Sequence, residues 1–150
     1  MNFEQAEALN AAIRRLVISH RGRASVMLAE LGLNIGQEVL LLELARVGPR
    51  TQAQLATAAR CEPPTITMAV RKLEAAGLVD RAPSAQDARA VVVSLTAHGQ
   101  ELLPALRRTW QDLAEQTISQ AADMSATQVI DTLDRLSQGL VQSADGTAAR

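Results

Sequence analysis

Polar and basic side chains follow one another at helical spacing after Pro63. Thr65 and Thr67 stand near the start of this segment, and Met68 comes directly after them. Arg71 lies one helical turn further on, so one face of a helix would carry hydroxyls, a thioether and a guanidinium. Such groups contact base edges and phosphates when a helix enters the major groove of DNA, and an arginine can bond guanine. The alternative is that the two threonines only cap the helix and face solvent.

Arg89 is the strongest single candidate for a contact with DNA, because an arginine at the tip of a hairpin can enter the minor groove. Its alternative role is that of a solvated turn residue. Asp87 is expected to pair with Arg81 or Arg89 and to hold the shape of the hairpin. The remaining candidates for DNA contacts lie in the preceding helix, turn and strand: Gln52, Gln54, Arg60, Pro63, Lys72 and Arg81.

Cys61 is the single cysteine of the chain, so no internal disulfide can form. A thiol just before a helix can have a lowered pKa, which makes an oxidation switch conceivable, but packing as a small apolar residue is the favoured interpretation. His20 and His98 give no metal-site spacing with it. Paired carboxylates, a Ser-His or Cys-His arrangement and a phosphate-binding glycine loop do not appear at a spacing that catalysis could use, which predicts no enzyme and no cofactor.

Two helices separated by a short turn are predicted to position these groups. Thr51 and Gln54 can form a capping box at the start of the first helix, and residues 59–62 interrupt its pattern. The second helix should run from Pro63 to about Ala76, because proline suits a first helical turn and Gly77 suits a left-handed cap.

A β-hairpin is predicted after this pair of helices. Its strands are residues 78–82 and 90–95, the second rich in β-branched valine, and the polar residues 83–89 connect them.

Amphipathic helices are predicted on both sides of this region. The first covers residues 3–31, and a short helix with a capping box of Asn34 and Gln37 follows it. Thr96 should cap a helix that contains Pro104, and the capping box of residues 125–128 should open the last helix. The order is therefore α-α-α-α-β-β-α-α, a mainly α fold with a small hairpin.

Composition agrees with this plan. The chain has 150 residues, enough for one domain with flanking elements. It has no apolar run long enough to span a membrane or serve as a signal peptide, which predicts a cytoplasmic protein.

The net charge of the chain is −1, yet residues 46–89 hold seven basic and four acidic side chains, or +3. The remainder holds eight basic and twelve acidic side chains, or −4. Positive charge is thus concentrated on the predicted DNA-binding segment.

Three motifs in this order resemble the MarR family of bacterial winged helix-turn-helix transcriptional regulators. They are GPRTQAQLA at 48–56, PPTIT with RKLEAAGLV at 63–79, and D-x-R-x-x-x-V-x-L-T at 87–96. The chain departs from the family at Met68 and Ala88, where most members carry a basic residue.

The resemblance implies a homodimer that binds a palindromic operator in double-stranded DNA, acts as a repressor and is released by a small-molecule effector or an oxidant. Residues 1–33 and 100–143 would form the helical dimerisation region, 34–99 the DNA-binding domain and 144–150 a flexible tail. The alternative to a DNA-binding regulator is a helical adaptor whose winged domain binds protein. Such an adaptor would not require basic residues on both the helix and the wing.

Overall fold

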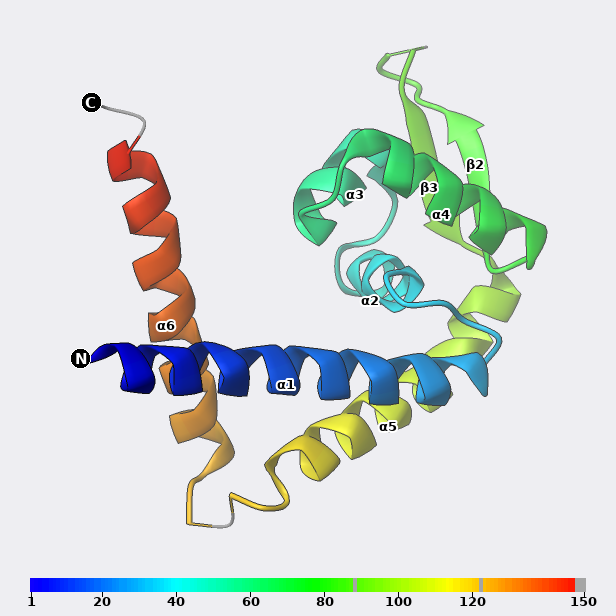
Figure 1. The fold of residues 1–150 in the computed structure, drawn as a ribbon. Helices are drawn as coiled ribbons and strands as arrows, with labels where there is room; N and C mark the ends of the chain where they lie inside the picture. Colours follow the sequence, from blue (N-terminus) through cyan, green and yellow to red (C-terminus); the bar gives the residue numbers. More distant parts are fainter. Residues whose placement is uncertain (88, 122, 148–150) are drawn as a thin grey trace. The chain divides into compact units, whose positions relative to one another are not determined.

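The computed structural model describes residues 1–87, 89–121 and 123–147, with side chains as far as Leu140. The chain forms two compact units, one that ends at Leu113 and one that begins at Ala114. The elements follow the predicted order with one added strand (Figure 1): α1 Phe3–Ala29, α2 Gln37–Val47, β1 Arg50–Thr51, α3 Gln52–Ala59, α4 Pro63–Ala75, β2 Val79–Pro83, β3 Val91–Leu95, α5 Ala97–Ile118 and α6 Ala126–Thr147. The predicted mainly α fold with a β-hairpin is confirmed.

The sheet has the order β1-β3-β2, and both pairings are antiparallel. Strand β2 begins and ends one residue later than predicted, and β3 begins one residue later and ends at Leu95 as predicted. Val79 pairs with Leu95, and Pro83 pairs with Val91. The two-residue strand β1 pairs Arg50 with Val93. The sequence did not predict it, because two residues carry no periodicity and the pairing exists only once β3 lies alongside.

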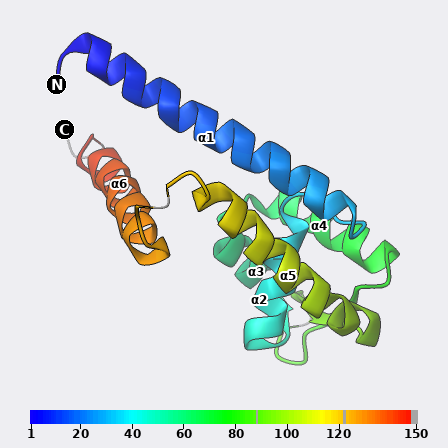
Figure 2. The same ribbon diagram turned by 90° about the horizontal axis from the view of Figure 1, so that it is seen from below.

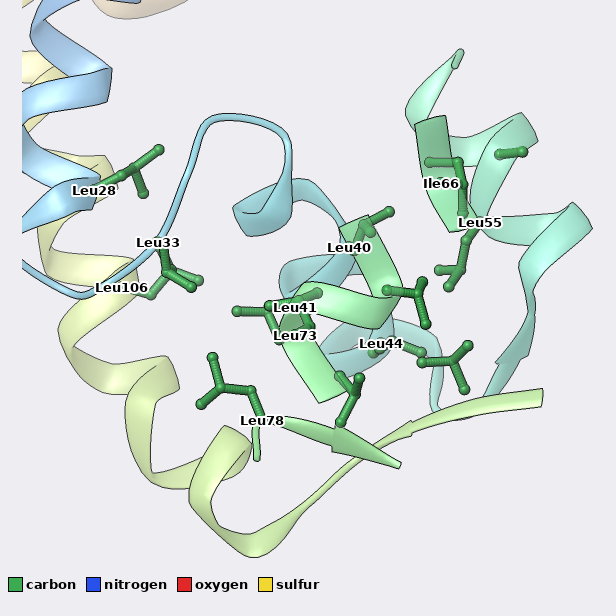
Figure 3. Close-up of a cluster of buried hydrophobic side chains, with 14 residues drawn as sticks. Leu28, Leu33, Leu40, Leu41, Leu44, Leu55, Ile66, Leu73, Leu78 and Leu106 are labelled. Carbon is green, nitrogen blue, oxygen red and sulfur yellow. The ribbon is translucent and has the colours of Figure 1, made fainter. Parts of the chain in front are cut away.

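Helix α2 lies at the centre of the main hydrophobic core. Its Leu40, Leu41 and Leu44 pack with buried residues of α1, α3, α4, β2, β3 and α5 (Figure 3). The C-terminal half of α1 lies alongside α5 (Figure 2). Ala24 and Met27 of α1 pack there with Leu113 of α5. The core therefore holds the predicted DNA-binding elements in one body with the end of α1 and the start of α5.

The start of α2 differs from the prediction. A backbone turn joins the amide of Gln37 to the carbonyl of Asn34 at 3.1 Å, and the helix begins only after it, with Gly36 as its N-cap at φ +94°. Gln37 Oε1 accepts a hydrogen bond from the Asn34 amide at 2.8 Å, but the predicted capping box of Asn34 and Gln37 is wrong, because the side chain of Asn34 does not cap the helix. Instead, Glu38 Oε2 accepts a hydrogen bond from the Gly36 amide at the start of the helix.

The capping boxes at the other helices follow the prediction. Ser125 Oγ accepts from the Gln128 amide at 3.3 Å, and Gln128 Oε1 accepts from the Ser125 amide at 2.8 Å. Helix α6 runs to Thr147, beyond the predicted start of the tail, and residues 148–150 lie outside the described residues. None of the helices in the described part of the chain has the length and apolar content needed to cross a membrane.

Candidate nucleic-acid interface

Helix α3 begins with the predicted capping box. Thr51 Oγ1 accepts a hydrogen bond from the Gln54 amide at 3.2 Å, and Gln54 Oε1 accepts one from the Thr51 amide at 2.9 Å. This uses the carbonyl end of the Gln54 side chain and leaves its NH₂ group as a donor. The helix ends at Ala59 because Arg60 adopts the left-handed conformation at φ +49°, with its side chain exposed.

Helix α4 begins at Pro63 as predicted, and its two faces are distinct. Ile66, Val70 and Leu73 are buried against the core. Helical spacing places the other predicted contact residues on the outer face, where the side chain of Met68 is 54% exposed. The exposed members of the predicted set on this helix are Pro63, Thr65, Met68, Arg71 and Lys72.

Thr67 is the exception among the α4 candidates. It is half-buried, and its hydroxyl lies 3.1 Å from the Pro63 carbonyl and 3.5 Å from Gln52 Oε1. A hydroxyl has one proton to donate, and the shorter contact is the one within the helix. The Thr67 hydroxyl is therefore already hydrogen-bonded within the protein, whereas Thr65 is exposed.

Helix α4 passes into the hairpin through a tight cap at Gly77. The Leu78 amide donates to the Leu73 carbonyl at 3.0 Å and the Gly77 amide donates to the Glu74 carbonyl at 2.8 Å, which is the Schellman pattern. Gly77 takes φ +71°, a conformation that favours glycine. Thr96, the residue after β3, also stabilises this junction, because its hydroxyl donates to the Gly77 carbonyl at 2.7 Å.

The tip of the hairpin is organised by side chains that accept backbone hydrogen bonds. Asp87 Oδ1 accepts from the Arg89 amide at 2.9 Å, and Ser84 Oγ accepts from the Gln86 amide at 3.2 Å. Asp87 therefore contacts Arg89 through the backbone amide of that residue. The side chain of Arg89 is exposed at the tip.

Arg81 does not pair with Asp87, so that part of the prediction is wrong. Its Nε donates to Glu74 Oε2 at 2.8 Å, and its Nη2 lies 2.6 Å from the same oxygen. The hydrogen bond to Glu74 raises the pKa of Arg81 further, so the guanidinium stays charged. The sequence did not indicate Glu74 as the partner, because nothing in it shows that a residue in the last turn of a helix will face the middle of the next strand.

Four of the predicted basic residues remain without such a partner. Within the described part of the chain, no ion pair joins a carboxylate to Arg60, Arg71, Lys72 or Arg89, and all four are exposed. They come from the α3–α4 turn, the outer face of α4 and the tip of the hairpin, the elements shown in green in Figure 1. Their charge is therefore available to an anionic partner.

Cys61 lies in the α3–α4 turn, and its thiol donates to the Ala59 carbonyl at 3.3 Å. It is exposed, so the favoured interpretation of Cys61 as a packing residue is wrong. Arg60, which precedes it, takes the left-handed conformation at φ +49° and ends α3. An open depression of about 460 Å³ runs along this turn, and its lining includes Ala53, Thr57 and Cys61. Among the described residues, no group of three or more His, Cys, Asp and Glu side chains lies together as a metal site would require.

Comparison with known proteins places this arrangement among bacterial regulators. Residues 33–91 match the sequence profile of the MarR family. An uncharacterized HTH-type transcriptional regulator of Mycobacterium leprae is 35% identical over 107 residues, which cover 71% of this chain and 72% of that protein. Other mycobacterial relatives, named transcriptional regulators or repressors, are 35% to 40% identical, and the matched segment spans 59% of their length. All of these relatives are named regulators rather than enzymes, in agreement with the prediction.

Solved structures agree with the fold. A MarR variant from Escherichia coli complexed with operator DNA has a TM-score of 0.76 at 21% identity, covering 93% of this chain and 98% of that one. Bordetella bronchiseptica BpsR, described with a mechanism by which 6-hydroxynicotinic acid regulates its DNA binding, has a TM-score of 0.73 at 18% identity, covering 87% of this chain and 97% of that one.

Proposed function

The chain belongs to the MarR family, and we propose that it is a sequence-specific transcriptional repressor that binds a palindromic operator in double-stranded DNA as a homodimer and is released by a small-molecule effector. The observation that carries this proposal is the outer face of α4, whose Arg71 and Lys72 are exposed beside a hairpin that ends in Arg89. A repressor of this kind acts in the cytoplasm, where the bacterial DNA lies.

The contacts with DNA follow from the geometry of the two elements. Helix α4 enters the major groove, where Arg71 bonds a base or phosphate and Met68 offers an apolar contact to a thymine methyl group. The hairpin follows the adjacent backbone, and Arg89 enters the minor groove, where narrow A·T segments concentrate negative potential. Gln52, Gln54 and Arg60 approach phosphates from α3 and its turn.

The homodimer is supported by apolar faces that the described residues leave exposed on two helices. On α1 they include Phe3, Leu9 and Leu16, and on α6 they include Ile130 and Leu136. Burying one such side chain stabilises a complex by about 1.5–3 kcal/mol, so several together can offset the entropy lost on association. A second copy supplies a matching face by symmetry, and its twofold axis requires an operator whose half-sites form an inverted repeat.

Effector release is proposed from the physics of a dimer that holds two half-sites at once. A ligand that changes the spacing of the two DNA-binding regions by a few ångströms weakens both sets of groove contacts together. The similarity to BpsR, whose DNA binding is regulated by 6-hydroxynicotinic acid, supports the same proposal. Repression follows when the bound dimer blocks access of polymerase to a promoter.

The proposal is tested by selecting bound duplexes from a pool of genomic fragments with the native protein, Arg89→Ala and the control Arg107→Ala. Arg107 is an exposed arginine on α5, and the hairpin tip points away from α5 (Figure 1). We expect the native protein and Arg107→Ala to enrich an inverted repeat and Arg89→Ala to lose most of the enrichment. A folded, dimeric native protein that enriches no duplex, with or without candidate aromatic acids, would refute the regulator and favour the protein-binding adaptor.

A further inference from the structure

One ion pair connects α4 to the hairpin. Glu74 lies in the last turn of α4, and Arg81 occupies the middle of β2. Both Nε and Nη2 of the guanidinium contact a single carboxylate oxygen, Glu74 Oε2, at 2.8 and 2.6 Å. The two side chains are about one third exposed, at 31% for Arg81 and 37% for Glu74, so solvent reaches the pair.

The backbone places the side chains of Glu74 and Arg81 next to each other. Residues 79 and 81 point to the same face of β2, and Val79 is buried in the core that α4 shares. The cap at Gly77 reverses the chain within two residues, which brings β2 back along the end of the helix. Arg81 is also held by its register opposite Val93 in β3. The ion pair therefore spans the turn between two rigid elements.

Contact with a phosphate is the competing role for Arg81, because the sequence also placed it among the candidates for DNA contacts. A phosphate at this guanidinium would have to approach the carboxylate of Glu74 as well, and the two anions repel each other. The unpaired arginine at the hairpin tip, Arg89, has no such acidic neighbour among the ion pairs of the described residues. The geometry thus separates two arginines that the sequence analysis had both included among the candidates for DNA contacts.

We propose that Glu74 and Arg81 are positioning residues that set the angle of the hairpin relative to α4, so that Arg89 reaches its groove when α4 occupies the neighbouring one. Arg81 is then not itself a phosphate contact. This inference rests on the proposed DNA-binding function. It adds that part of the affinity depends on a pair of side chains that touch no DNA.

The test is a double-mutant cycle on operator affinity with Glu74→Gln, Arg81→Gln, both together, and the exchanged pair Glu74→Arg with Arg81→Glu. We expect each single change to weaken binding roughly three- to fivefold, the upper range for an exposed ion pair, with an unchanged salt slope. The double variant should be no weaker than either single variant, and the exchanged pair should recover part of the loss. Surface ion pairs add little stability, so all variants should fold.

Glu43→Gln is the matched control. Glu43 pairs with Arg46 at 2.8 Å, but both residues belong to α2 and join no two elements. Its loss should leave operator affinity unchanged. If Arg81 contacts a phosphate instead, Glu74→Gln will strengthen binding and Arg81→Gln will lower the salt slope by about 0.9, and either result overturns the inference.

A second measurement separates this inference from the proposed function. Hydrogen exchange of the β2 and β3 amides in the free protein reports on the hairpin without DNA. We expect Glu74→Gln and Arg81→Gln to accelerate this exchange equally and Glu43→Gln to leave it unchanged. If the native protein binds no duplex but exchange rises in both variants, the proposed function fails while the positioning role stands. If exchange rises in neither variant, the positioning role is refuted.

Discussion

Gly99 is the position where adding one methyl group should damage the fold most clearly. It lies in the first turn of α5, and a Cβ built there would stand 2.1 Å from the Leu78 carbonyl oxygen and 3.2 Å from Leu95 Cδ2. Ordinary contacts are 3.4 Å or more, so the carbonyl would have to move by more than 1 Å. That carbonyl accepts the Thr96 amide at 3.1 Å, so the movement also breaks a hydrogen bond at the root of the hairpin.

The magnitude of the Gly99→Ala effect combines three contributions. Overpacking costs about 1–3 kcal/mol, and loss of the hydrogen bond costs about 1 kcal/mol. Replacing glycine by alanine within a helix stabilises it by about 0.5–1 kcal/mol, which partly offsets this loss. The free energy of unfolding should therefore fall by about 2 kcal/mol, which lowers Tm by roughly 4–8 °C in a chain of this size.

Thermal and urea unfolding at one fixed protein concentration measure this loss, since dimerisation makes Tm depend on concentration. Gly22→Ala is the control, because Gly22 lies in α1 with nothing within 4 Å of its added Cβ. It should be neutral or slightly stabilising. The steric reasoning is refuted if Gly99→Ala is as stable as Gly22→Ala.

Three further predictions concern single side chains. Arg89→Ala should lower the slope of log affinity against log salt by about 0.9 in operator titrations, because one phosphate charge is no longer neutralised. An unchanged slope would show that the Arg89 side chain neutralises no phosphate. Burial raises the pKa of Glu38, which is 4% exposed, so stability should fall as pH rises from the usual carboxyl range through that raised pKa. Glu38→Gln should flatten this pH dependence in urea titrations, because an uncharged side chain still accepts the Gly36 amide; persistence of the full pH dependence would contradict it. Thr51→Ala removes the cap of α3 and should cost about 1 kcal/mol in the same assay, whereas Thr51→Ser should cost little.

Local chemistry made several elements predictable from the sequence. Thr51 with Gln54 and Ser125 with Gln128 form capping boxes within four residues, and Gly77 takes the left-handed conformation that ends α4. These interactions join neighbours along the chain, which makes them readable from the sequence, although the same pattern at Asn34 and Gln37 forms no capping box. The exposed face of α4 was predictable for the same reason, because helical spacing separates Met68 from the buried Ile66 and Val70.

Only the tertiary structure decided which of these side chains are free to bind a partner. Arg81 and Arg89 are both arginines on one hairpin, but the fold pairs Arg81 with Glu74 and leaves Arg89 exposed. In the same way, Cys61 is exposed because of the turn at Arg60, and strand β1 exists because β3 lies next to it. The physical reason is that burial and ion pairing depend on contacts between elements, and a pattern within one element does not record which neighbour it will meet.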